Sequence, residues 1–272
     1  MIAMLLNILI KGVDIMYGRI SDEKEKILMK EFAKSCERAG VENILAKYQE
    51  HKIPNTISEL IVGHRLSWYI LQSRIGNNLP RRLDCYDRYC DFEFRDIAIH
   101  YCGFSLVAWE WVDPLIKQMK TYTNNEQPKI LEIMAGMGAI TFALRQKGLT
   151  DVIACDNQSI GEIFDYSKQW TNVEFIDCIE AMKQHPETQI VICSWPRDDG
   201  TMTKFIKTMH EVNPKCVLIY IGELEYGCNA EVEFFDNVIE THDFYEAEDK
   251  FKSWSGINDG IHSFKYKVDE GD

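Results

Sequence analysis

The segment between residues 131 and 156 combines glycines and carboxylates in an order that suits nucleotide binding. A short apolar run, KILEIM, contains Glu132 and is followed by Gly136, Gly138 and the helical pattern ITFALRQKG. A second apolar run, DVIACD, ends at Asp156, 18 residues after Gly138. Glycines that follow a strand let the backbone approach a nucleotide, and a carboxylate that ends the next strand can accept hydrogen bonds from ribose hydroxyls. The spacing therefore predicts a nucleotide site.

A dinucleotide site is a competing interpretation of the same turn. The dinucleotide pattern is G-x-G-x-x-G, and in this chain Thr141 stands at the third glycine position. The residues therefore favour a single nucleoside, and an NAD(P)-dependent oxidoreductase is the weaker alternative.

Two later segments place polar and aromatic residues just after apolar runs. QIVICSW ends in Ser194 and Trp195, and KCVLIYIG is followed by Glu223. A carboxylate that is partly desolvated in a cleft can act as a general base. We predict Glu223 as the base, with Ser194 and Trp195 beside the reacting groups; the alternative for Glu223 is a solvated loop residue. Trp195 and Trp254 could form a wall of the pocket or pack in the core.

The seven histidines and nine cysteines do not show metal-site spacing. No H-x3-H, H-E-x-x-H or C-x2-C pattern is present, so we expect no metal site. The odd number of cysteines at irregular spacing is typical of reduced thiols in a cytosolic protein. We expect Cys155, Cys178, Cys193 and Cys216 to be buried, because they lie in or beside apolar runs.

Strands and helices alternate from residue 129 onward. Apolar runs predict strands at KILEIM, DVIACD, NVEFID, QIVICSW and KCVLIYIG, with two more strands near 240–246 and 261–268. Amphipathic stretches between them predict helices, including residues 160–169 and 230–239. This alternation predicts an α/β fold with a Rossmann-like, mainly parallel seven-stranded sheet and helices on both faces.

The first strand and its turn resemble motif I of the class I S-adenosylmethionine-dependent methyltransferases. The usual form of that motif is E-x-G-x-G-x-G, and this chain matches it with Glu132, Gly136 and Gly138. Met134 stands where the first glycine is expected. The resemblance implies S-adenosylmethionine as the cofactor, with Asp156 on its ribose.

The same resemblance implies four further cofactor-binding residues. Ala135 belongs to the turn and Asn157 follows Asp156, while Asp177 and its neighbour Cys178 stand at the adenine end. In this family the third strand ends in an acidic or polar residue that meets the adenine amino group. Asp177 is also a good N-cap for a helix that begins at Ile179, and the two roles can coexist.

Nucleic-acid methylation is disfavoured by a motif and by charge. Amino-methylating enzymes of nucleic acids carry (D/N/S)-P-P-(Y/F/W) after strand four, which Ser194-Trp195-Pro196-Arg197 does not match. The net charge is −13, and residues 127–272 carry 13 Lys and Arg against 26 Asp and Glu. Phosphate backbones are bound by clustered Lys and Arg, so this half is a poor nucleic-acid binder.

Residues 100–268 are also similar to a scattered family of bacterial and fungal methyltransferase-like proteins. The segments that match this largely uncharacterised family are YCGFSL at 101–106, WP at 195–196, IGE and GC within 221–228, and W-x-G-I-x-D at 254–259. This resemblance implies the methyltransferase fold and no particular substrate.

Residues 1–96 form a second predicted region, a helical accessory domain before the Rossmann-like domain at 97–272. Periodic apolar residues predict helices at 21–50, with a separate helix at 41–50, and at 56–74. The apolar start, MIAMLLNILI, is too short to span a bilayer, which takes about 20 residues. We therefore expect a cytoplasmic protein with no membrane partner.

Two functions remain open at this point. The first is methyl transfer from S-adenosylmethionine to a small molecule or a protein side chain. The second is a non-catalytic Rossmann-like module for binding or assembly that keeps the nucleotide pocket, because a fold does not fix a function. The residues Met134 and Arg197 depart from the family pattern and favour the second function. The sequence leaves the acceptor and the oligomeric state open.

Overall fold

The computed structural model describes residues 41–57, 95, 98–159, 163–253 and 257–268. The chain divides into two compact units, residues 1–98 with 254–256 and residues 99–253 with 257–272. The described part of the first unit contains helix α3 (Val41–Gln49), which confirms the helix predicted at 41–50. The other helices predicted before residue 97 lie outside the described residues, as does most of the predicted 1–96 region.

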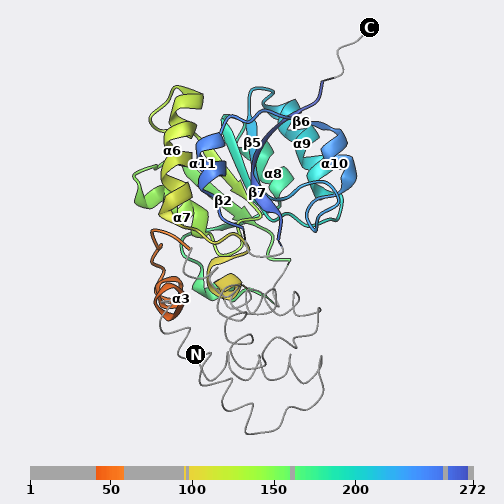
Figure 1. Ribbon diagram of the computed structural model, residues 1–272. Helices are drawn as coiled ribbons and strands as arrows, with labels where there is room; N and C mark the ends of the chain where they lie inside the picture. Colours follow the sequence, from red (N-terminus) through yellow and green to blue (C-terminus); the bar gives the residue numbers. More distant parts are fainter. Residues whose placement is uncertain (1–40, 58–94, 96–97, 160–162, 254–256, 269–272) are drawn as a thin grey trace, which may run out of the picture. The chain divides into compact units, whose positions relative to one another are not determined.

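The second unit is built on a seven-stranded sheet with the order β3-β2-β1-β4-β5-β7-β6 (Figure 1). Strands β1 to β5 are parallel, and β7 is antiparallel to both of its neighbours. The strands are β1 (Ile130–Ile133), β2 (Val152–Asp156), β3 (Glu174–Phe175), β4 (Ile190–Ser194), β5 (Val217–Glu223), β6 (Val238–Glu240) and β7 (Asp259–Tyr266).

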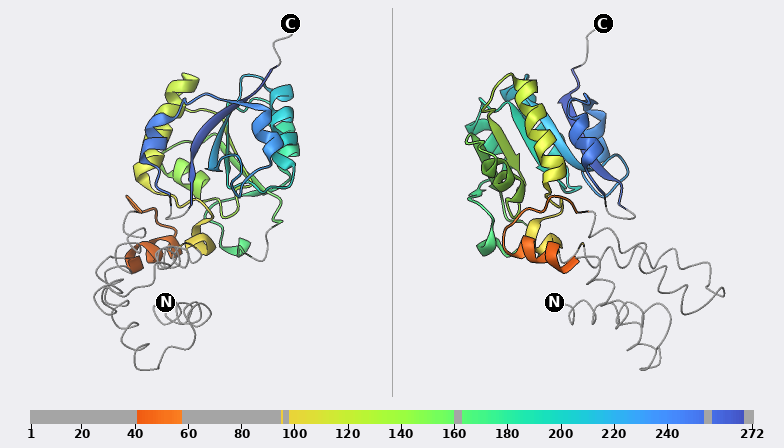
Figure 2. Two further views of the ribbon diagram at one scale, coloured as in Figure 1. Left: turned by 45° about the vertical axis from the view of Figure 1, so that its right-hand side comes forward. Right: turned by 60° about the vertical axis from the view of Figure 1, so that its left-hand side comes forward.

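Helices cover both faces of the sheet, three on each side (Figure 2). One face carries α6 (Trp109–Thr123), α7 (Ala139–Gln146) and α11 (Tyr245–Lys250), and the other carries α8 (Cys178–Gln184), α9 (Thr201–Val212) and α10 (Val232–Asp236). The central strands β1 and β4 are buried along almost their whole length, which suits a sheet covered on both faces. The predicted Rossmann-like α/β fold is therefore confirmed.

Side chains of the sheet and of α8, α9 and α10 make one contiguous apolar core. Its members are fully or almost fully buried and include Val191 and Leu218 from the strands, and Met182, Phe205 and Phe234 from the helices. The four cysteines predicted to be buried are all buried. They act here as small apolar side chains.

Several predicted elements differ from those observed. Residues 160–169 were expected to be helical, but the described part of this stretch contains only the 3-10 turn Tyr166–Lys168. The predicted strand at 240–246 begins earlier, as β6, and residues 245–250 form α11 instead. The predicted helix at 230–239 is shorter in the structure, where α10 ends at Asp236 and β6 begins at Val238. Polar and apolar residues mix without a clear period here, so tertiary packing decides the local structure.

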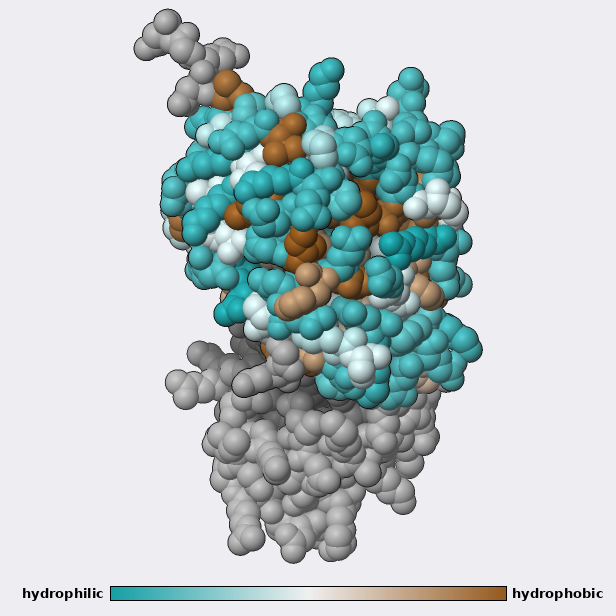
Figure 3. All heavy atoms as spheres, turned by 180° about the vertical axis from the view of Figure 1, so that it is seen from behind, coloured by the Kyte–Doolittle hydropathy of each residue, from teal (hydrophilic) through white to brown (hydrophobic). Residues whose placement is uncertain are grey.

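The surface of the described residues is mainly polar on the face shown in Figure 3, where hydrophobic side chains gather only in small areas. Within the described ranges, none of the helices combines the length and apolarity needed to cross a bilayer.

The second unit has its own core, so we expect a fragment that begins near residue 97 to fold alone. It should give a single cooperative thermal unfolding transition and the far-ultraviolet circular dichroism of a mixed α/β protein. A fragment that is expressed but shows no cooperative transition would contradict this expectation and would mean that the first unit is needed for folding.

Candidate functional site

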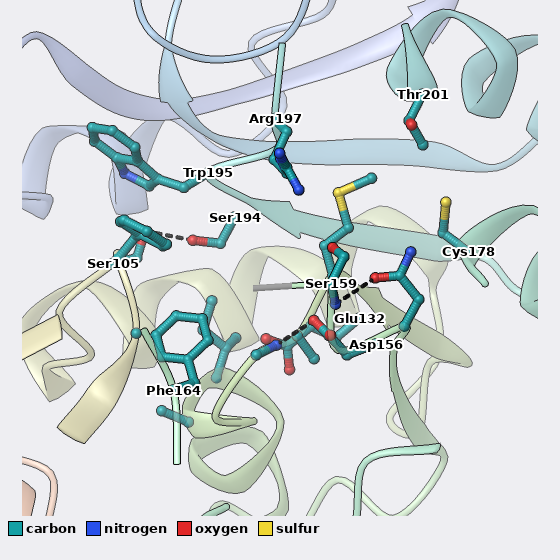
Figure 4. A pocket seen from close by; sticks show the side chains of 18 of the residues that line it. Ser105, Glu132, Asp156, Ser159, Phe164, Cys178, Ser194, Trp195, Arg197 and Thr201 are labelled. Atoms are coloured by element: carbon teal, nitrogen blue, oxygen red, sulfur yellow. Dashed lines mark hydrogen bonds between the residues drawn. The ribbon is translucent and has the colours of Figure 1, made fainter. Parts of the chain in front are cut away.

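A pocket of about 820 Å³, including space open to solvent, lies at the carboxyl ends of the central strands (Figure 4). Pockets for small ligands in proteins are usually of about 300–1,000 Å³. Its lining comes from the turn after β1, the ends of β2 and β4, the start of α8, and residues 102–105 ahead of α6. Open parallel sheets bind their ligands at this edge.

The turn from β1 to α7 follows a path that favours glycine. Met134, Gly136 and Gly138 have φ values of +52°, +52° and +71°. Met134 therefore keeps the backbone conformation of the glycine that it replaces, at the cost of an unfavourable φ for a side chain. Ala135 and Gly136, both predicted as cofactor-binding residues, line the pocket, and so does Met134, which was not predicted there.

Gly138 is predicted to bind the cofactor, and its positive φ is an unusual backbone angle that favours glycine. It does not belong to the described lining of the pocket. A Cβ atom at this position would lie 2.8 Å from Val173 Cγ2 and 3.1 Å from Thr171 Cγ2. Gly138 is thus needed for its positive φ and for close packing on the segment before β3.

Asp156 ends β2 beneath the pocket and is only 6% exposed. Its Oδ2 accepts a hydrogen bond from Gly136 N at 2.8 Å, and its Oδ1 accepts one from Gln158 N at 2.5 Å. One carboxylate therefore holds the glycine turn and the loop after β2 together. Asn157 also lines the pocket, and its Oδ1 accepts a hydrogen bond from Ser159 N at 3.1 Å.

Glu132 lies in the middle of the sheet rather than at its surface. It is 2% exposed, and its Oε2 accepts a hydrogen bond from Thr141 N, at the start of α7, at 2.8 Å. Burial raises the pKa of this carboxyl from 4.5 to about 7, and the nearby charge of Asp156 adds to the rise. Glu132 therefore fastens helix α7 to the sheet and also borders the pocket.

Asp177 and Cys178 both line one end of the pocket, at the start of α8. Asp177 is the N-cap of that helix, because its Oδ1 accepts a hydrogen bond from Ile179 N at 2.9 Å. Burial raises the pKa of the Cys178 thiol to about 12, so the thiol is neutral at physiological pH. Asp177 combines its capping role with a place in the pocket wall.

The opposite end of the pocket, which we call the serine–tryptophan end, is formed by Phe104, Ser105, Ser194 and Trp195. Ser194 Oγ donates to Ser105 Oγ at 2.6 Å, and Ser105 is only 4% exposed. The rings of Phe104 and Trp195 are stacked, with centroids 5.7 Å apart and planes at 17°. In Figure 4, Cys178 lies on the other side of the pocket from these residues.

Several lining residues were not predicted as part of a site, among them Ser105, Ser159, Phe164 and Thr201. Phe164 is buried and packs edge-on against Phe104, from a stretch that had been expected to be helical. Ser105 lies in a segment that the family resemblance singled out, so the sequence carried a signal for it. Arg197, noted only as a departure from the family pattern, also lines the pocket, and its Nε lies 3.9 Å from Asp199 Oδ2.

Glu223, predicted as the general base, is not among the described residues that line the pocket. It is 8% exposed, and its two carboxylate oxygens accept hydrogen bonds from Cys228 N at 2.9 Å and from Asn258 N at 3.0 Å. Because Glu223 is not part of that lining, its carboxylate is not placed to take a proton from a ligand in the pocket. The structure therefore does not support Glu223 as the general base. Trp254, the second predicted wall residue, lies outside the described residues.

The part of the chain that the structure describes contains no candidate metal site, in the sense of three or more His, Cys, Asp or Glu side chains that could hold one ion.

No protein-family model and no curated protein matches the chain. Among solved structures, it is similar to a TehB-like SAM-dependent methyltransferase from Corynebacterium glutamicum, with 14% identity, a TM-score of 0.38, and coverage of 57% of this chain and 88% of that one. It is also similar to the plantazolicin methyltransferase BpumL, solved with a substrate analogue and SAH, with 11% identity, a TM-score of 0.38, and coverage of 78% and 98%.

Human N-acetylserotonin methyltransferase, solved with SAM, is a third similar structure, with 11% identity, a TM-score of 0.35, and coverage of 89% and 70%. At these identities and TM-scores the similarity does not assign a function to this chain. The narrower resemblance to a bacterial and fungal family stays a prediction, because no family model matches.

The packing of Gly138 predicts the cost of a side chain there. Gly138→Ala should lower the free energy of unfolding by more than the roughly 1–2 kcal/mol of an unfavourable φ, because its Cβ also meets Val173. Gly148→Ala is the matched control, since Gly148 has a φ of +85° and no atom near its added Cβ. Urea denaturation measures the free energy of unfolding of both variants. An equal loss of unfolding free energy in the two variants would show that the Val173 contact has no effect.

The raised pKa of Glu132 predicts a pH-dependent stability. Between pH 4.5 and about 7 the unfolded chain releases this proton while the folded chain keeps it, so stability falls as pH rises through that window. The loss should be on the order of 3 kcal/mol, since one pKa unit corresponds to about 1.4 kcal/mol.

Glu132→Gln keeps an oxygen that can accept from Thr141 N and cannot ionise. Relative to this variant, the wild type should lose stability between pH 5 and pH 8 in urea denaturation. Glu126→Gln, at an exposed glutamate, is the control and should follow the wild type. Parallel pH profiles for the wild type and Glu132→Gln would contradict the assignment.

Proposed function

We propose that the chain binds S-adenosylmethionine in this pocket and transfers its methyl group to a small molecule or a protein side chain. The observation that carries the proposal is the meeting of three features at the carboxyl ends of neighbouring strands. These are the positive-φ turn at Gly136, the carboxylate of Asp156 and the carboxylate of Asp177. A nucleoside needs this combination of close backbone approach and hydrogen-bond acceptors.

The residues present fit the adenosine part of the cofactor. Each oxygen of Asp156 accepts one backbone N–H and keeps a lone pair that can accept from a ribose hydroxyl. Asp177 uses Oδ1 for the N-cap of α8, and its other oxygen can accept from an adenine amino group. The apolar side chain of Ile176 lines the pocket beside Asp177, which suits a flat base.

Charge and aromatic rings in the lining suit a cationic ligand. The carboxylates of Asp156, Asp177 and Asp199 line the pocket, against the single described cation Arg197. The faces of aromatic rings such as Trp195 also attract cations. S-adenosylmethionine, when bound, supplies an electrophilic methyl group on a positively charged sulfur.

The serine–tryptophan end would position the acceptor. Two hydroxyl groups carry two hydrogens, and one of these is used between Ser194 and Ser105. The second hydrogen can be donated to an oxygen or nitrogen of the acceptor. Trp195 and Phe104 would exclude water beside it and fix its direction of approach, so that alignment makes the main contribution to the rate.

A second candidate is a module that binds the nucleotide without methyl transfer. The position of Glu223 favours it, because the side chain predicted as general base has its carboxylate bound to two backbone N–H groups. An assay with S-adenosylmethionine that carries a labelled methyl group distinguishes the two candidates. The chain is incubated with metabolite and protein extracts, and transfer of the label to a component of an extract is measured. A cytoplasmic location and a non-nucleic-acid acceptor stay predictions of the sequence.

Binding of S-adenosylhomocysteine, measured by calorimetry, tests the cofactor assignment. Asp156→Ala should bind it about ten- to a hundredfold more weakly, because each hydrogen bond to a charged group contributes roughly 1.5–3 kcal/mol. NAD should not compete. Asp249→Ala, at an exposed aspartate, is the control and should bind as the wild type does.

Asp156→Ala also removes the partner of Gly136 N, so its thermal unfolding should be measured beside binding. An unchanged affinity in a folded Asp156→Ala protein would remove Asp156 from the site.

A further inference from the structure

Two sequence segments that do not belong to the described pocket lining, residues 222–229 and 257–259, meet at the side chain of Glu223. Glu223 ends β5, and each of its carboxylate oxygens binds a different segment. Oε2 accepts from Cys228 N at 2.9 Å, and Oε1 accepts from Asn258 N at 3.0 Å. The carboxylate therefore joins the loop after β5 to the residues that lead into β7.

The loop after β5 is packed tightly around Glu223. A Cβ atom on Gly227 would lie only 2.4 Å from Glu223 Cβ, so no other residue fits without movement of the backbone. A Cβ atom on Gly222 would lie 2.9 Å from Asn229 Oδ1. Asn229 Oδ1 in turn accepts from Glu223 N at 2.9 Å. The glycines on either side of Glu223 are thus explained by close packing rather than by ligand contact.

The same two segments hold the residues that follow β4. Asp259 Oδ2 accepts a hydrogen bond from the indole Nε1 of Trp195 at 3.1 Å, and Ser253 Oγ donates to Asp259 Oδ1. Asn229 Nδ2 donates to the carbonyl oxygen of Pro196 at 3.3 Å. The side chain of Trp195 and the backbone of Pro196 are therefore fixed by partners that Glu223 connects.

Trp195 needs such support because its backbone is strained. Its φ is +53°, a value that is unfavourable for a bulky side chain. Strained conformations persist only where the surrounding structure holds them, and they gather at functional sites. Trp195 is also part of the pocket wall, stacked on Phe104.

We infer that Glu223 is a positioning residue that holds Trp195 in the wall of the pocket. Its carboxylate fastens residues 224–229 and 257–259, and their side chains Asn229 and Asp259 fix Pro196 and Trp195. One part of the inference rests on the proposed function, namely that Trp195 lies beside the methyl acceptor. It assigns Glu223 a role without proton transfer.

The indole N–H signals in a proton–nitrogen NMR spectrum test this inference without an acceptor. Trp195→Phe identifies the Trp195 signal by its loss. In Glu223→Ala, the Trp195 indole N–H should exchange with solvent at least about tenfold faster, because Asn258, next to its partner Asp259, loses its hydrogen bond to the carboxylate and the start of β7 opens more often. Asp259→Ala should produce the same change directly.

Two tryptophans serve as internal controls. Trp111 donates its indole N–H to the carbonyl oxygen of Leu106 at 3.1 Å, and Trp170 donates to that of Tyr101 at 2.7 Å. Both signals should be unchanged in Glu223→Ala. Glu225→Ala, at an exposed glutamate of the same loop, should leave all three signals as in the wild type.

An unchanged Trp195 signal in Glu223→Ala would overturn the inference. An equal change in all three signals would also overturn it, since the carboxylate would then support the fold as a whole. Glu223→Gln keeps one acceptor oxygen and should give a smaller increase in exchange than Glu223→Ala. Failure of the wild type to bind S-adenosylhomocysteine would contradict the proposed function alone and leave the result for Trp195 intact.

Discussion

The hydrogen bonds accepted by the buried carboxylate of Asp156 are the interaction on which the pocket depends. They join Gly136, in the turn after β1, to Gln158, in the loop after β2. Unpaired buried N–H groups are costly, so a residue without a side-chain acceptor at this position would leave both backbone groups unsatisfied. The same side chain that would bind a ribose therefore also builds the turn that approaches the nucleotide.

Carboxylates serve the structure in three other places around this edge of the sheet. Glu132 fixes the start of α7, Asp177 caps α8, and Glu223 joins two loops. Negative side chains are stabilised at helix N-termini, where N–H groups have no partner within the helix. The acidic character of the C-terminal half thus has a structural component.

Much of the fold could be predicted because strong patterns coincide with buried elements. Strands β1, β2, β4 and β5 appear in the sequence as continuous apolar runs, and these strands are buried on both faces of the sheet. The short elements could not be predicted in the same way. Strand β6 has three residues and α11 has six, too few for a periodic pattern to be distinguished from a loop.

One part of the pocket could be predicted from the sequence, because its residues follow one another along three successive strand–turn units. Ala135, Gly136, Asp156, Asn157 and Asp177 were predicted, and all five line the pocket. Phe164 was not, since it reaches the pocket from a stretch of irregular backbone and carries no local pattern.

By itself, the sequence determined the class of fold, the strand ends at which a ligand would bind, and the glycines of the first turn. These follow from local periodicity and from the backbone angles that only certain residues adopt readily. Only the tertiary structure decided the direction in which each side chain points. Glu223 and Ser194 both end buried strands, yet Ser194 lines the pocket while Glu223 turns toward the N–H groups of Cys228 and Asn258. That choice depends on N–H groups of the loop after β5 and of Asn258, 35 residues away in the sequence, which no local pattern reveals.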